Sequence, residues 1–155
     1  MGAGKSTLGK QLAKKLAVPF FDLDHIIERQ IESSISEFFD SHSEESFRDI
    51  EANCLRQIAL TPSVVSVGGG TPCFKNNMKY MNEVGKTIYL EGSPLFLASR
   101  LEKSKAKRPL IADIDSDQLV EFIEKHLAER SVFYQQAHHS VQIPIRSSDD
   151  ILEAF

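Results

Sequence analysis

The clearest chemical signal in the sequence is Gly2-Ala3-Gly4-Lys5-Ser6-Thr7, which follows Met1. These residues match the second half of the phosphate-binding pattern G-x-x-x-x-G-K-[ST], whose glycines let successive backbone N–H groups turn toward a phosphate at the positive end of a helix. In that pattern the lysine reaches the β- and γ-phosphates of a nucleotide, and the next hydroxyl, here that of Ser6, ligates Mg²⁺. We therefore expect residues 2–7 to bind ATP together with its metal ion.

Two aspartates, Asp22 and Asp24, lie at the C-terminal end of a short apolar segment, residues 18–23. Their spacing turns both carboxylates to one side of an extended chain, and ligands of open α/β sheets bind beyond such strand ends. One carboxylate can then hold the Mg²⁺ shell through water, while the other accepts the proton of a substrate hydroxyl. The alternative for Asp24 is an ordinary helix N-cap.

Arg48 and Glu51 stand three residues apart in the helical pattern of residues 43–60, which allows an ion pair on one helix face. Taken alone, the pair indicates a surface salt bridge. The alternative is an arginine that Glu51 holds rigid, so that its planar fork can grip a carboxylate.

Three consecutive glycines, Gly68, Gly69 and Gly70, directly follow the apolar residues 64–67. The absence of side chains lets backbone amides approach a ligand at the end of this predicted strand. A plain loop is the alternative, although three glycines cost conformational entropy that a simple turn does not require.

Arginines in the second half of the chain complete the set of candidates. Arg108 lies in a polar, basic segment, residues 102–117, which we expect to be a mobile loop that folds over the phosphates, excludes water and neutralises charge. Arg130 and Tyr134 lie on the predicted helix that follows this loop.

The elements that must position these residues alternate between short apolar strands and amphipathic helices, which predicts a parallel sheet covered by helices. A capping box formed by Ser41 and Glu44, and an N-cap and first turn formed by Ser93 and Pro94, are expected to start two of the helices. We expect strands at residues 18–23, 64–67, 87–90 and 140–143, and helices at residues 5–17, 24–32, 43–60, 93–101, 118–138 and 149–155.

Composition narrows the class of protein. The 155 residues fit one domain, and the apolar runs are too short to span a membrane. A net charge of −4 with two short basic patches favours an anionic small molecule over a nucleic acid. Two cysteines, Cys54 and Cys73, without a CxxC spacing indicate a reducing cytoplasm.

In its order of motifs the chain resembles the shikimate kinase family, from Met1 to about Val141. The motifs are GAGKST, Asp22-Leu23-Asp24, Phe47-Arg48-x-x-Glu51, Gly68-Gly69-Gly70, Arg108-Pro109-Leu110 and Arg130-x-x-x-Tyr134. The resemblance implies a single α/β domain, residues 1–155, with the three-layer P-loop kinase fold: a central parallel sheet, helices on both faces and a mobile lid. It also implies a cytoplasmic, monomeric enzyme that converts ATP and shikimate to ADP and shikimate 3-phosphate, with Mg²⁺ as cofactor and no nucleic acid or membrane partner.

The same resemblance implies a role for each matching residue. Lys5 contacts the phosphates, Ser6 and Asp22 serve the metal, and Asp24 binds the substrate hydroxyls and is the candidate base. Arg48 and Arg130 bind the shikimate carboxylate, residues 68–70 line the substrate with Gly69 the closest, and Arg108 is the lid arginine. Arg146 and Arg100 are candidate adenine contacts.

Two features depart from the family pattern. The tail after Val141 matches weakly, and the first strand and first loop glycine are missing, so we expect about ten further residues before Met1 that form a central apolar strand. Without that strand the chain is expected to be unstable or inactive. Gluconate kinases and small nucleotide kinases share the phosphate loop and a lid, so gluconate or a nucleotide is an alternative acceptor. The alternative that is not an enzyme is an inactive truncated remnant.

Overall fold

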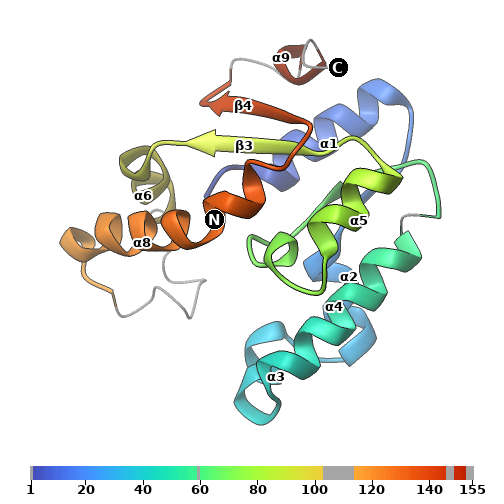
Figure 1. The fold of residues 1–155 in the computed structure, drawn as a ribbon, viewed down its shortest axis with the longest axis horizontal. Coiled ribbons are helices and arrows are strands. Elements are labelled where there is room, and N and C mark those ends of the chain that lie inside the picture. The colour runs from blue at the N-terminus through green and yellow to red at the C-terminus, as the bar shows by residue number, and fades with distance from the viewer. Residues whose placement is uncertain (1, 59, 103–113, 146–148, 153–155) are drawn as a thin grey trace.

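The computed structural model describes residues 2–58, 60–102, 114–145 and 149–152 (Figure 1), and the described strands form two pairs. Strand β1 (Phe20–Asp22) pairs with β2 (Val64–Ser66), and Phe20 lies opposite Val64. Strand β3 (Ile88–Gly92) pairs with β4 (His139–Ile143), and Ile88 lies opposite His139. Both pairings are parallel, which confirms the prediction from the alternation of strands and helices.

Helices surround the two strand pairs in the predicted order, with three additions. The helices α3 and α5 and the 3₁₀ helix η1 are not among those predicted from the sequence. None of the described helices combines the length and the apolar character that a membrane crossing requires. The helices are α1 (Lys5–Leu16), α2 (Leu23–Ile31), α3 (Ile35–Ser41), α4 (Glu44–Ile58), the 3₁₀ helix η1 (Thr71–Cys73), α5 (Asn77–Val84), α6 (Pro94–Glu102), α8 (Ser116–Tyr134) and α9 (Asp149–Leu152).

The predicted capping box of Ser41 and Glu44 is wrong, because Ser41 is the last residue of α3. The capping box instead begins α3: the Ser34 hydroxyl accepts from the Glu37 N–H at 3.2 Å, and the Glu37 carboxylate accepts from the Ser34 N–H at 2.9 Å. Helix α4 follows Ser43, whose hydroxyl accepts from a first-turn N–H at 3.2 Å.

Other boundaries lie close to those predicted. Ser93 starts α6, where its hydroxyl accepts from the N–H of Phe96 at 3.3 Å, as expected of an N-cap. Helix α8 begins two residues before the predicted position and ends at Tyr134 instead of residue 138, because a turn leads from there into β4. Residues 103–113, most of the expected lid, lie outside the described residues, as does the last part of the helix expected at residues 149–155.

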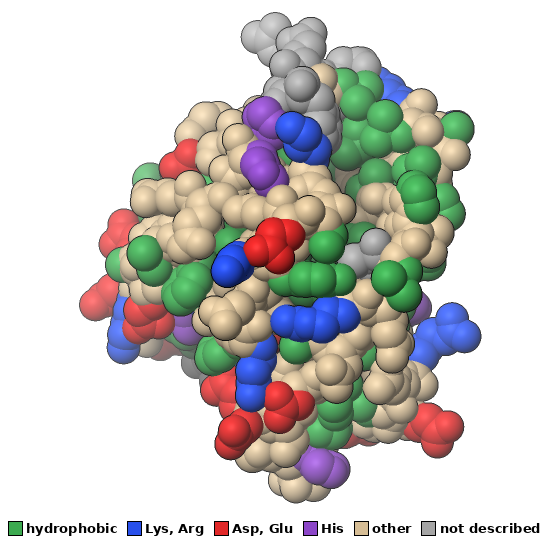
Figure 2. Space-filling view, turned by 45° about the vertical axis from the view of Figure 1, so that its right-hand side comes forward, with side chains coloured by type: hydrophobic (Ala, Val, Ile, Leu, Met, Phe, Trp, Pro, Cys, Tyr) green, Lys and Arg blue, Asp and Glu red, His purple; other side chains and the backbone are tan. Residues whose placement is uncertain are grey.

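A cleft of about 720 Å³ separates the two strand pairs. It is lined from one side by Val64 and Val65 of β2 and from the other by Ile88 and Leu90 of β3. At its mouth are large apolar side chains that reach solvent, such as Leu60, and Figure 2 shows hydrophobic side chains gathered among charged ones on one face of the molecule. The described strands therefore form two separate sheets rather than one continuous sheet.

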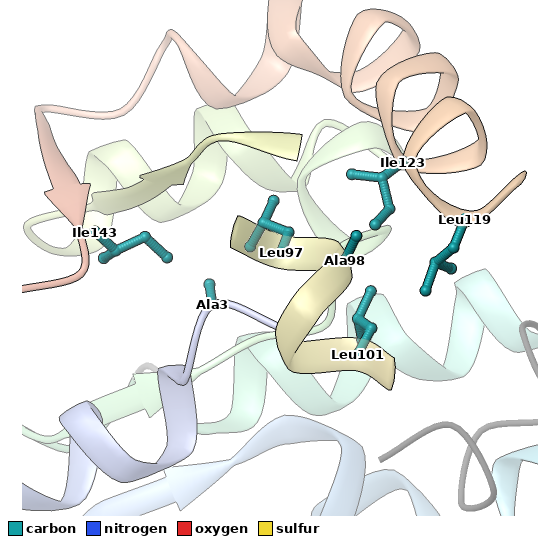
Figure 3. Packing of buried hydrophobic residues seen from close by; sticks show 7 residues of the cluster. All are labelled: Ala3, Leu97, Ala98, Leu101, Leu119, Ile123 and Ile143. Carbon is teal, nitrogen blue, oxygen red and sulfur yellow. The ribbon is translucent and has the colours of Figure 1, made fainter. Parts of the chain in front are cut away.

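Two apolar clusters hold the helices in place. One lies among α2, α3 and α4 and comprises Leu23, Ile27, Phe38, Phe47, Cys54, Leu55 and Ile58. The other joins α6, α8 and β4 to the glycine loop and comprises Ala3, Leu97, Ala98, Leu101, Leu119, Ile123 and Ile143 (Figure 3). Because Ala3 belongs to the second cluster, the apolar core itself fixes the start of the chain's phosphate-binding motif.

Candidate active site

The predicted phosphate loop has the backbone that its glycines allow. Gly2 and Gly4 have φ angles of 72° and 84°, in the left-handed region that side chains disfavour. A Cβ on Gly2 would also lie 3.1 Å from Leu101 Cγ. Gly4 is the N-cap of α1 and makes no side-chain cap hydrogen bond, and the N-terminus of a helix favours an anion.

Close packing of α1 on the first strand pair brings this loop to the strand ends. A Cβ on Gly9 would lie 2.6 Å from a ring carbon of Phe20 and 3.0 Å from Ser66 Oγ, so only glycine permits this approach. As a result, Ser6 in the first turn of α1 reaches Asp22 at the end of β1. The Ser6 hydroxyl donates a hydrogen bond to Oδ2 of Asp22 at 2.6 Å.

The Ser6 and Asp22 pair suits a magnesium ion. Mg²⁺ prefers oxygen ligands and is commonly held by one or two protein groups together with substrate phosphates and water. A hydroxyl and a carboxylate already in contact, beside the N-terminus of α1, offer that donor set. The residues present therefore fit the metal that the sequence predicts at this position.

Asp24 lies in the first turn of α2, whose N-cap is Asp22, so the interpretation of Asp24 as the N-cap is wrong. Although its side chain reaches solvent, the surrounding protein desolvates the carboxyl and raises its pKa above the ordinary value. The negative charge of Asp22 raises this pKa further, and the Lys5 ammonium partly opposes the shift. These effects place Asp22, Asp24 and Lys5 within one electrostatic site.

The three-glycine turn contacts a different candidate residue at each position. A Cβ on Gly68 would lie 3.0 Å from Oδ1 of Asp24, and a Cβ on Gly70 would lie 2.7 Å from Nη2 of Arg48. Between them, the carbonyl of Gly69 accepts a hydrogen bond of 2.6 Å from the Tyr134 hydroxyl on α8. The turn therefore brings α2, α4 and α8 together, which a plain loop would not require.

Arg48 is held rigid, as one of the two sequence interpretations proposed. Its Nη1 donates to Oε2 of Glu51 at 2.8 Å and its Nη2 donates to Oε1 of Glu44 at 2.9 Å. The guanidinium also stacks over the ring of Phe74, 4.1 Å from its centroid. Glu51 is buried, so this pair is not an exposed surface salt bridge.

Arg130 approaches the same side of the site from α8. Burial raises the pKa of the Tyr134 hydroxyl, and the nearby Arg130 partly lowers it. Burial likewise raises the pKa of the Cys73 thiol, against the opposing charges of Arg130 and Arg48. Both guanidinium groups are therefore close enough to Cys73 for their charges to lower its pKa.

The remaining predicted residues differ in their placement. Thr7 is exposed in the first turn of α1. The guanidinium of Arg100 lies beside the phosphate loop, where its Nη2 would be 3.3 Å from a Cβ on Gly4. Arg108 and Arg146 lie outside the described residues. Thr71 and Asn77, which are fully buried behind the glycine turn, were missed because neither belongs to a recognisable motif.

This fold and site define a P-loop kinase for a small molecule. The sequence profile of the shikimate kinase family matches residues 1–155, and the chain therefore belongs to that family. The shikimate kinase of Bacteroides fragilis is 45% identical over 140 residues, which cover 90% of this chain and 78% of that protein. The shikimate kinase of Flavobacterium johnsoniae is 38% identical over 156 residues, covering 99% of this chain and 91% of that protein.

Solved structures agree with this assignment. The crystal structure of shikimate kinase from Bacteroides thetaiotaomicron has a TM-score of 0.91 and 39% identity, and the match covers 99% of this chain and 92% of that chain. The shikimate kinase from Acinetobacter baumannii in complex with shikimate has a TM-score of 0.86 and 28% identity, with 99% and 84% covered. The chain is accordingly an ATP-dependent phosphotransferase with the predicted α/β fold.

Proposed function

We propose that the chain transfers the γ-phosphate of ATP to the 3-hydroxyl of shikimate, through the residues that meet at the glycine turn. The observation that carries this proposal is the convergence of Asp24, Arg48 and the Arg130 helix on residues 68–70. A carboxylate beside two arginines suits an acceptor that has both hydroxyl groups and a carboxylate.

On the donor side, the N–H groups of residues 2–7 and the Lys5 ammonium would hold the β- and γ-phosphates. Ser6 and Asp22 would hold Mg²⁺, which when bound neutralises charge that builds up on these phosphates. Arg108 is proposed to add positive charge from the lid, and Arg100 and Arg146 to contact the adenine.

On the acceptor side, Arg48 and Arg130 would orient the substrate through its carboxylate, and Asp24 would hold the reacting hydroxyl. The hydroxyl oxygen forms a bond to the γ-phosphorus while the bond from that phosphorus to the β–γ bridging oxygen breaks. The hydroxyl proton passes to the Asp24 carboxylate, whose raised pKa makes it a better proton acceptor than an ordinary aspartate.

A coupled assay of ADP release tests the proposal directly. ADP release is measured with shikimate, with gluconate, with nucleoside monophosphates and with no acceptor. Release that depends on shikimate alone is the expected result. Release with gluconate or a nucleotide would replace the acceptor, and no acceptor-dependent release would indicate an inactive remnant.

We also propose that the protein acts as a monomer in the cytoplasm and needs neither nucleic acid nor membrane. Its net negative charge disfavours a nucleic-acid partner, and two cysteines without a CxxC spacing suit a reducing compartment. Light scattering at working concentration measures the oligomeric state, and a dimer mass would contradict this part of the proposal.

A further inference from the structure

The residue that follows the three glycines, Thr71, is fully buried behind the acceptor side of the site. Its hydroxyl donates a hydrogen bond of 2.6 Å to Oε1 of Glu51. The other oxygen of this carboxylate, Oε2, accepts from Nη1 of Arg48 at 2.8 Å. Because Glu51 is only 1% exposed, its charge depends on donors from the protein rather than on bulk water. The carboxylate therefore links Thr71 to Arg48.

Thr71 is itself fixed from its other side by Asn77, which is also fully buried. The Asn77 side-chain amide donates to the carbonyl of Thr71 at 3.0 Å, and its Oδ1 accepts from Nη1 of Arg56 at 3.1 Å. The Arg56 guanidinium also lies over the ring of Tyr80, 4.8 Å from its centroid. Arg56 and Glu51 are both on α4. Thr71 is therefore hydrogen-bonded to this helix at two points, directly at Glu51 and through Asn77 at Arg56.

The position of the Arg48 fork depends on this arrangement. A buried carboxylate oxygen that loses a donor is costly, so the Glu51 side chain would turn toward other donors if the Thr71 hydroxyl were removed. Arg48 would then keep its bond to Glu44, which is exposed and holds it only weakly. Because the guanidinium already lies against Gly70, it has little room to shift without leaving its place in the site.

We propose that Thr71 is a positioning residue for the acceptor: its buried hydroxyl orients Glu51, which in turn orients Arg48 toward the acceptor carboxylate. Thr71 acts through Glu51 rather than by touching the acceptor. This inference rests on the role proposed above for Arg48. A merely structural role would instead weaken folding, or all kinetic constants together.

Three variants separate these roles. Thr71→Val removes the hydroxyl but keeps the branched shape, and Thr71→Ser keeps the hydroxyl. Thr87→Val is the control: the hydroxyl of the half-buried Thr87 also donates a bond of 2.6 Å, to Asn82, and its other hydrogen bonds are to His138. In Thr71→Val we expect the KM for shikimate to rise about tenfold or more while the KM for ATP changes less than about twofold. Thr71→Ser and Thr87→Val should stay near wild type in both constants.

The methyl ester of shikimate adds a readout that folding defects would not reproduce. The ester lacks the carboxylate charge that Arg48 is proposed to grip, so Thr71→Val and wild type should use it with equal efficiency. A Thr71→Val enzyme with the wild-type KM for shikimate would overturn the inference, as would an equal defect with the ester or a failure of Thr71→Ser to rescue.

If Thr71→Val fails to fold, calorimetric binding of shikimate to Thr71→Ala and Thr71→Ser decides the matter in the same way. Weaker binding by Thr71→Ala alone supports the inference, and equal binding by both overturns it. The proposed function fails separately: a wild-type protein that phosphorylates no shikimate contradicts that proposal, whereas an active wild type with an unaffected Thr71→Val contradicts only the role of Thr71.

Discussion

Gly70 has an ordinary backbone, with a φ of −82°, yet its lack of a side chain matters because Arg48 occupies the space beside it. A Cβ would lie 2.7 Å from Nη2 and 2.9 Å from Nη1 of that arginine. We predict that Gly70→Ala raises the KM for shikimate by displacing the guanidinium. Gly85→Ala is the control, because its Cβ would meet no atom closer than 4.0 Å. Equal KM values for the two variants would refute the prediction.

Arg48 and Arg130 are the residues whose loss should affect the acceptor most. Losing one charge-assisted partner in a closed site costs roughly 2 to 5 kcal/mol, so Arg48→Ala or Arg130→Ala should lower kcat/KM for shikimate by about 30-fold or more. ATP binding should remain nearly intact. Steady-state kinetics with each substrate varied in turn measures both effects, and near wild-type kcat/KM in either variant would remove that arginine from the carboxylate site.

Asp24 gives a prediction about pH. Because its pKa is higher in the folded protein than in the unfolded chain, its contribution to stability is present below the unfolded pKa and is lost as pH rises through the folded pKa. We expect Asp24→Asn to be inactive but to melt at a higher temperature than wild type at neutral pH.

By NMR titration, Asp22→Asn should lower the Asp24 pKa, since it removes a like charge, and an unchanged value would contradict this coupling.

Single residues and their motifs could be read well from the sequence, because the chemistry of Lys5, Ser6 and Asp22 follows from type and spacing. The contacts behind the motif could not. Thr71 meets Glu51 across 20 positions of the chain, and Tyr134 meets Gly69 across 65. No local pattern encodes such pairs, which become visible only when the helices are placed against the glycine turn.

At the scale of elements, the long amphipathic helices were predictable and the short ones were not. Helix α3 has seven residues and α5 has eight, too few for a clear apolar period. Ser41 with Glu44 three residues later matches the spacing of a capping box. The same spacing at Ser34 and Glu37 is the pair that the fold uses.

The two serines allow a direct test of this element. The Ser34 hydroxyl satisfies a first-turn N–H of α3, whereas the Ser41 hydroxyl contacts only its neighbour His42 among the hydrogen bonds of the described residues. Replacing an N-cap serine by alanine costs typically about 1 kcal/mol, so Ser34→Ala should lower the free energy of unfolding by about that amount. Urea denaturation of Ser34→Ala and Ser41→Ala measures the difference, and equal losses would disprove the capping role.

At the scale of the whole molecule, the described strands form two pairs with a cleft between them. The edges of β2 and β3 face this cleft, and Ala3 lines it where the chain enters α1. Strand edges carry unpaired backbone N–H and C=O groups, and each one that is buried without a partner costs on the order of 1 to 3 kcal/mol. Several such groups would rival a typical net stability of roughly 5 to 15 kcal/mol.

We therefore predict that an apolar strand placed between β2 and β3 stabilises the protein and supports its activity. A fusion ahead of Met1 of about ten residues provides a strand of roughly five or six residues and a short turn. Valine and isoleucine suit a strand buried on both faces, and a glycine and serine segment of equal length is the control. The apolar fusion should raise both the melting temperature and the rate of ADP release with shikimate, and the control fusion should raise neither. The prediction is wrong if residues 1–155 alone unfold cooperatively, phosphorylate shikimate at the rate of the fused protein and gain nothing from the apolar segment. That result would show that the cleft needs no strand.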